Sequence, residues 1–146
     1  MKKSYFLFSR ELKISVFLFL FVLVIAAISC DSKPPYNSKV AQAQRGKLIF
    51  QKNCVQCHGE NGKGIMIDSL QTKAADLTQI KYSRRTKEFP ILEIANMIDG
   101  RKMAKSHGSR VMPVWGEVFS KNEHLDEMQI KGKMAELIAY LMTIQE

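Results

Sequence analysis

The stretch "CVQCHGENGKG", residues 54–64, places two cysteines three positions apart, follows the second with His58, and then runs through three glycines. The whole chain of 146 residues has only three cysteines, so a pair at this spacing indicates a specific chemistry. Such pairs act as redox dithiols, as half of a zinc site, or as the two thiols that react with the vinyl groups of haem. The neighbouring residues distinguish these possibilities.

The surroundings of the pair favour haem. A thioredoxin-like dithiol needs a strand-helix-strand setting, whereas the apolar spacing of this chain is helical. A structural zinc ion needs four ligands, but the third cysteine, Cys30, and the other histidines are isolated from the pair. Two thiols followed directly by a histidine are what haem attachment requires. We therefore predict one covalently bound haem c, attached at Cys54 and Cys57 with His58 as an axial iron ligand; zinc without haem is the alternative.

The N-terminal residues have the pattern of a targeting segment. Basic residues precede an apolar run of 15 residues, from Ile14 to Ile28, which is the length of a signal-peptide core and shorter than a membrane span of about 20 residues. The run ends in "AAISC", which resembles the lipobox of bacterial lipoproteins. We predict a signal peptide over residues 1–29 and lipidation of Cys30, with an uncleaved anchor helix or an ordinary secretory signal as alternatives. Each version places the domain outside the cytoplasm, on the periplasmic side.

Residues 30–37, "CDSKPPYN", are expected to form the lipidated N-terminus and a stiff proline-containing tether, followed by one domain over residues 38–146. The net charge of +8 suggests a membrane surface, nucleic acid or an acidic protein as partner. We expect membrane attachment through the N-terminus and redox partners with acidic docking surfaces, and no nucleic acid. Basic residues in "KYSRRTK" (81–87) and "GRKMAK" (100–105) are candidates for that docking, although a merely solvated surface explains them equally well.

Apolar spacing in the domain predicts an all-α fold with about three main helices and long loops. A first helix places Val40, Ala43, Gly46, Ile49 and Phe50 on one face. A second is expected over "FPILEIANMID" (89–99), with a proline in its first turn and a glycine after its end. The last helix has the clearest stripe, and no segment indicates a strand. The stripe consists of Ile130, Met134, Leu137, Ile138, Leu141 and Ile144.

A second axial ligand must come from a loop that passes over the ring. Met112 is the first candidate, because it follows a loop and precedes Pro113, which restricts Met112 to an extended conformation. His107 and Met103 lie in the same loop and are its rivals. The other methionines are better explained as core residues.

The chain resembles class I cytochromes c with one haem. The resemblance rests on "GKLIF" (46–50) before "CVQCHG" (54–59), on "MPVWG" (112–116), and on "ELIAYL" (136–141), in the order of that family. It implies that Gly46 and Phe50 of the first helix contact Leu137 and Tyr140 of the last, because glycine lets two helix backbones approach closely.

One feature departs from the family pattern. Many members have a proline shortly after the Cys-His-Gly run, and a carbonyl there accepts the imidazole Nδ1–H of the haem ligand. No proline stands in "ENGKGIMIDSL" (60–70). We expect another carbonyl between Gly64 and Leu70 to take that role, and an apolar wall beside His58 built from residues 65–67.

Histidine and thioether ligation implies a function. These ligands favour Fe(II) relative to two histidines and leave no open position on the iron, so we expect an electron carrier rather than an enzyme. Met112 and Trp115 should cover the enclosed edge of the haem; Trp115 either donates to a propionate or fills the core. The alternatives are a haem enzyme or gas sensor with an open distal site, and a haem c subunit of a larger oxidase or oxidoreductase.

Overall fold

The structure of the chain is a computed structural model that describes residues 12–21, 33–68, 71–102 and 112–146. The chain divides into two compact units, Met1–Pro34 and Pro35–Glu146. In the first, residues 12–21 form a helix. Among the described residues, no helix combines the length and the apolar character needed to cross a membrane. The predicted lipidation site Cys30 and the rival ligands Met103 and His107 lie outside the described residues.

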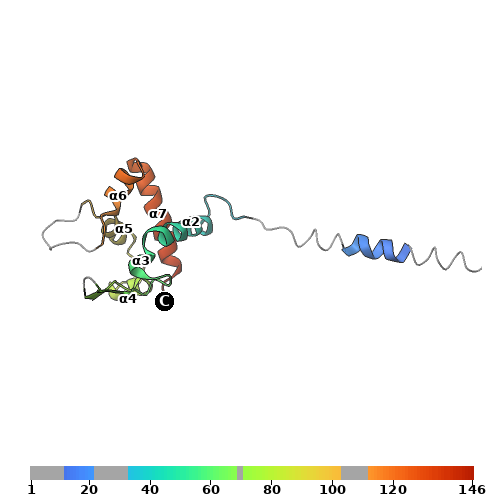
Figure 1. The fold of residues 1–146 in the computed structure, drawn as a ribbon, viewed down its shortest axis with the longest axis horizontal. Coiled ribbons are helices and arrows are strands. Elements are labelled where there is room, and N and C mark those ends of the chain that lie inside the picture. The colour runs from blue at the N-terminus through green and yellow to red at the C-terminus, as the bar shows by residue number, and fades with distance from the viewer. Residues whose placement is uncertain (1–11, 22–32, 69–70, 103–111) are drawn as a thin grey trace, which may run out of the picture. The chain divides into compact units, whose positions relative to one another are not determined.

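The first helix of the second unit, α2 (Lys39–Asn53), begins at Ser38, whose side chain accepts a hydrogen bond of 3.1 Å from the Ala41 backbone (Figure 1). This contact satisfies one of the free N–H groups of the first turn. The buried residues of α2 are Ala41, Gly46, Ile49 and Phe50. The predicted inclusion of Val40 was wrong: its side chain is 59% exposed, and the neighbouring Ala41 is buried instead.

The last helix, α7 (Glu127–Thr143), crosses α2 as the family resemblance implied. Asp126 and Gln129 form a capping box at its start, and the predicted stripe is buried up to Leu141, with Ile144 half-buried just after the helix. A Cβ atom on Gly46 would lie 1.9 Å from the carbonyl oxygen of Glu136 in α7. The rings of Phe50 and Tyr140 pack with centroids 5.2 Å apart. The two backbones therefore touch at a point where only glycine fits.

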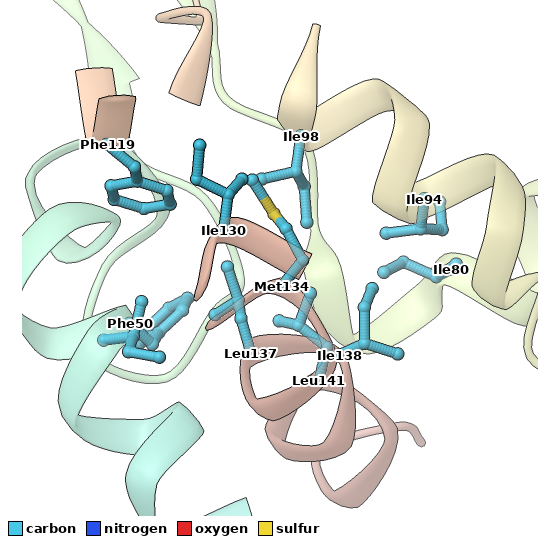
Figure 2. Packing of buried hydrophobic residues seen from close by; sticks show 11 residues of the cluster. Phe50, Ile80, Ile94, Ile98, Phe119, Ile130, Met134, Leu137, Ile138 and Leu141 are labelled. Carbon is cyan, nitrogen blue, oxygen red and sulfur yellow. The ribbon is translucent and has the colours of Figure 1, made fainter. Parts of the chain in front are cut away.

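Two further long helices contribute to the core, together with Ile80 of a short one. The predicted second helix is confirmed as α5 (Ile91–Asp99), which directly follows Pro90 and ends at Gly100 in the left-handed conformation. Apolar spacing did not predict α6 (Trp115–Asn122), which contributes Phe119. Figure 2 shows side chains of α2, α5, α6 and α7 converging around Leu137 and Met134. The fold class is all-α, as expected.

Short elements connect these helices. The segment after Cys54 forms α3 (Val55–His58), and η2 (Leu77–Gln79) leads into α4 (Ile80–Ser83). Between them β1 (Met66–Ile67) and β2 (Thr72–Lys73) pair antiparallel, with Met66 opposite Lys73. The expectation of no strand was therefore wrong. Two-residue strands are too short to show alternation in a sequence, and pairing alone defines them.

Candidate cofactor site

The cysteine pair and the histidine lie on one tight turn. Cys54 closes α2 through a hydrogen bond of 2.8 Å from its backbone N–H to Phe50, and its own carbonyl accepts from Cys57 and His58 at 3.2 and 2.9 Å. This helical hydrogen bonding places the two side chains, three residues apart, on one face. Both thiols are free and partly buried. The turn therefore presents two thiols and an imidazole as a group.

These three side chains line a cavity of about 290 Å³. Met112 and Trp115 line the same cavity from a distant part of the chain. Its walls are mainly apolar, and they include many of the core side chains drawn in Figure 2. The apolar lining residues comprise Phe50, Ile67, Leu77, Ile80, Ile94, Ile98, Leu137 and Leu141. Two thiols, an imidazole and a thioether around an apolar space suit a flat metalloporphyrin attached by thioether bonds.

The imidazole of His58 is held by a backbone carbonyl beyond the predicted range. Its Nδ1 lies 3.0 Å from the carbonyl oxygen of Ala75. Because a carbonyl only accepts, Nδ1 must carry the proton, and Nε2 keeps its lone pair for a metal. The expectation of a partner between Gly64 and Leu70 was wrong, since the β1–β2 hairpin carries the chain through that range and returns it at Ala75.

A glycine makes this return possible. Gly64 has a φ of +73°, and a Cβ atom there would lie 2.0 Å from the carbonyl oxygen of Ala74. The N–H of Gly64 also donates to the carbonyl of His58 at 2.9 Å, and the N–H of Ala74 donates to Ile65 at 3.0 Å. The hairpin is thus bound to the turn that carries the ligand. Glycine in a loop is too common for the sequence to single out this role.

The predicted apolar wall beside His58 is only partly present. Ile67 lines the cavity. Ile65 and Met66 are 44% and 60% exposed, so they do not cover the site as expected. The other apolar cover comes from core helices, which the local sequence does not reveal.

The environment of the thiols disfavours a redox dithiol. Burial, and secondarily the neighbouring Cys57, raise the pKa of the Cys54 thiol to about 11. A redox dithiol needs a thiolate near neutral pH, which this environment disfavours. Within the described residues, no three side chains of His, Cys, Asp or Glu gather where they could hold a metal ion. The zinc alternative thus gains no support there.

Trp115 is the first residue of α6, and Met112 lies three residues before it. Met112 is partly buried against the core, and Trp115 packs on Phe119 with ring centroids 5.7 Å apart. Met97 of α5 also lines the cavity, although its place within a helix had indicated a core residue only. Its sulfur accepts a hydrogen bond of 3.5 Å from Arg84. The sequence contained no signal that distinguished this methionine from the others.

Two cations also line the cavity. Lys73 follows Thr72 in β2, and Arg84 comes directly after α4 and forms an ion pair of 3.1 Å with Glu93. Arg84 belongs to the basic stretch 81–87, so that stretch contributes to the cavity wall as well as to the surface. Cations beside an apolar cavity suit a ligand with an apolar body and acidic groups.

Comparisons with known proteins agree with this site. The chain is 25% identical over 96 residues, 66% of its length, to the cbb3-type cytochrome c oxidase subunit CcoP of Azospirillum brasilense. It is 40% identical over 55 residues, 35% of its length, to a cytochrome c-553-like protein of Synechocystis sp.. These matches cover 28% and 52% of the two relatives, respectively. No solved structure matches the chain at a significant level.

The sequence model of the family described as cytochrome c matches residues 43–145. That range contains the thiol pair, the whole lining of the cavity and the crossing of α2 with α7. Since it spans well over half of the chain, the protein belongs to the cytochrome c family, carries covalently attached haem c and transfers electrons.

Proposed function

We propose that this protein is a one-electron carrier in which Cys54 and Cys57 hold a single haem c and His58 and Met112 are the axial ligands of its iron. The observation that supports this most directly is the cavity itself. Met112 lines it together with a thiol pair and an imidazole that lie more than fifty residues earlier in the chain.

The side chains of the cavity have distinct roles in this proposal. Bound haem supplies a one-electron change between Fe(III) and Fe(II). The Ala75 carbonyl orients His58 and increases the basicity of its Nε2. The thioether of Met112 favours Fe(II) and closes the sixth position to substrates. The apolar walls exclude water, so little solvent reorganises when the charge of the site changes.

The place of its segment supports Met112 as the ligand. It stands before Pro113 and α6, lines the cavity, and is only partly exposed. A carrier with both axial positions filled is not an enzyme, because a substrate finds no vacancy on the iron. Trp115, beside it on the cavity wall, either donates its N–H to a haem propionate or supports the apolar wall.

The location and partners of the protein form the second part of the proposal. The signal-like segment of residues 1–29 and the lipobox-like "AAISC" support an extracytoplasmic protein that is attached to the membrane through Cys30. The exposed cations Arg85 and Lys87 supply positive charge for docking an acidic redox protein. Such docking weakens as the salt concentration rises.

A subunit role is the second candidate function. It is favoured by the similarity to an oxidase subunit, which extends over 66% of this chain. In that case the protein passes electrons within a stable complex. Gentle solubilisation followed by sizing of the haem-containing fraction distinguishes the two roles. A carrier elutes alone, whereas a subunit elutes with a larger oxidase.

The ligand assignment is tested by comparing two methionine variants of the haem-loaded protein. Ferric haem with a methionine ligand has a weak absorption band at the red end of the visible spectrum. We expect the band in the wild type, its loss in Met112→Ala, and its retention in Met128→Ala, whose side chain is 83% exposed on α7. Only the Met112 variant should bind carbon monoxide readily when reduced.

The opposite results would overturn the proposal. A wild type that lacks the band and binds carbon monoxide readily has an open distal site, as in a gas sensor or haem enzyme. A wild-type band that shows no haem stain on a denaturing gel would contradict covalent attachment at Cys54 and Cys57, because thioether-linked haem stays on the chain.

A further inference from the structure

Arg101 is held between two carboxylates at the end of α5. Its Nε and Nη2 atoms each donate to one oxygen of Asp99 at 2.8 Å. On the other side, Nη1 and Nη2 donate to the two oxygens of Glu127, the latter at 3.2 Å. We call Asp99, Arg101 and Glu127 the arginine clamp. It joins the last residue of α5 to the first residue of α7.

The clamp depends on the shape of a guanidinium group. Arginine offers parallel N–H donors that match a carboxylate bidentately, and here it does so on two sides at once. Hydrogen bonds from Arg101 hold the pKa of Asp99 and of Glu127 below their usual values. Lysine has the same charge but cannot make the same set of bonds.

The start of α6 rests on this clamp. Gly116, the second residue of α6, is buried, and a Cβ atom there would lie 2.5 Å from Asp99 Oδ1 and 2.4 Å from Arg101 Nε. These two side-chain atoms are hydrogen-bonded to each other, so moving either away would break a bond of the clamp. The backbone of the first turn of α6 is therefore seated directly against it.

Met112 lies three residues before that turn, separated from Trp115 only by Pro113 and Val114. The carbonyl of Val114 accepts from Glu117 and Val118 at 3.0 and 3.1 Å, so the turn is closed just after Pro113. Pro113 has a fixed φ and also restricts the backbone of Met112. A shift of Gly116 should therefore also move Met112. Both Met112 and Trp115 line the cavity from this short segment.

We propose that the arginine clamp positions Met112 over the haem iron and so determines how often the sixth coordination position opens. Arg101 is a positioning residue, since it acts on the iron only through α6 and Met112. This inference rests on the proposed role of Met112 as a ligand. It assigns a function to an ion-pair cluster that lies outside the cavity.

The test is the rate at which cyanide binds to the ferric, haem-loaded protein at saturating cyanide. Cyanide can bond to the iron only after the thioether has left, so this rate reports the opening of the sixth position. We expect it to rise about tenfold in Arg101→Gln, as when a charge-assisted cluster loses its central partner. Arg101→Lys should lie in between, because the charge remains and the bidentate geometry is lost.

A matched control separates positioning from general loosening. Arg45 forms a comparable ion pair with Glu136 at 2.5 Å that joins α2 to α7, and the two arginine side chains are 28% and 27% exposed. Arg45→Gln should destabilise the protein without changing the cyanide rate. Gly116→Ala, which disturbs the clamp from the opposite side and keeps all its charges, should raise the rate; it also serves if Arg101→Gln does not fold.

The Met112→Ala background completes the experiment. If the clamp acts through Met112, adding Arg101→Gln to Met112→Ala changes the already fast rate no further. A wild-type rate in Arg101→Gln, an equal rise in Arg45→Gln, or a persistent rise in the Met112→Ala background would each overturn the inference. If instead Met112→Ala alone leaves the wild-type rate unchanged, the ligand assignment itself has failed.

Discussion

The imidazole Nδ1 of His58 lies 3.0 Å from the carbonyl oxygen of Ala75, 17 residues further along the chain. The chain reaches Ala75 through the two-stranded β1–β2 hairpin. After the hairpin, the Ala74 carbonyl passes so close to Gly64 that a Cβ atom there would lie 2.0 Å from its oxygen. The orientation of the proposed iron ligand thus depends on a backbone path rather than on a neighbouring side chain.

Gly64→Ala tests this relationship. The left-handed φ of +73° and the approach of 2.0 Å to the Ala74 carbonyl must both change to admit a Cβ atom. We expect the free energy of unfolding of the haem-loaded protein to fall by about 2 kcal/mol. The midpoint potential should rise, because a less basic imidazole stabilises Fe(III) less. Voltammetry and thermal unfolding measure the two effects.

Gly132→Ala is the matched control for this change. Gly132 lies within α7, and among the described residues no atom beyond its chain neighbours and its own helix backbone stands within 4 Å of its Cβ position. Alanine there should stabilise the protein by up to about 1 kcal/mol through helix propensity and leave the potential unchanged. An unaltered potential in Gly64→Ala would show that the hairpin does not hold His58.

Gly46→Ala should disrupt the crossing of α2 and α7. A methyl group there overlaps the Glu136 carbonyl at 1.9 Å, and a helix backbone cannot move aside as a flexible side chain can. We expect a loss of about 3 kcal/mol, which outweighs the helix-propensity gain of about 1 kcal/mol. Thermal denaturation followed by circular dichroism measures it. Stability equal to the wild type would show that the helices tolerate separation.

Replacing both Cys54 and Cys57 by alanine should leave the chain largely unfolded. Without covalent haem, the cavity of about 290 Å³ remains in the core. At about 24 cal/mol per Å³, a void of that size costs on the order of 7 kcal/mol, comparable with the whole stability of a small domain. Circular dichroism should show little helix and no cooperative melt. Native-like helix content with a cooperative melt would contradict haem as part of the core.

Glu123→Gln should lower stability in a pH-dependent way. The hydrogen bond from Lys133 lowers the pKa of Glu123 most strongly. Partial burial opposes this shift, and a weaker hydrogen bond from Lys52 adds to it. Its contribution, about 1 kcal/mol, is complete above the ordinary pKa of 4.5 and disappears as the pH falls through the lowered value. Unfolding by urea at pH 7 and at pH 3 should show a larger difference from wild type at the higher pH. An equal difference at both would assign the effect to packing.

Cys30→Ser tests the proposed attachment to the membrane. A lipidated cysteine is expected to retain the protein in the membrane fraction, and serine cannot be lipidated in the same way. Mass spectrometry of the variant should therefore show no lipid modification, and the variant should no longer be found in the membrane fraction. Unchanged fractionation would point instead to an uncleaved anchor helix.

Features that depend on neighbouring residues could be predicted from the sequence. The spacing of Cys54, Cys57 and His58 predicts the chemistry because one helical turn brings the three side chains together whatever surrounds them. The stripe of α7 and the helix end at Gly100 were likewise predicted correctly, since periodicity and backbone preference act within a few residues. The family resemblance added the approach of Gly46 to α7.

Contacts between distant segments could not be predicted in this way, because they depend on how the whole chain folds. Three contacts are of this kind, each between segments that a loop brings together. They are His58 with the Ala75 carbonyl, Gly64 with the Ala74 carbonyl, and Gly116 with Arg101. A backbone carbonyl carries no sequence signal, because every residue has one. Packing of the whole chain selects the carbonyl that reaches the imidazole.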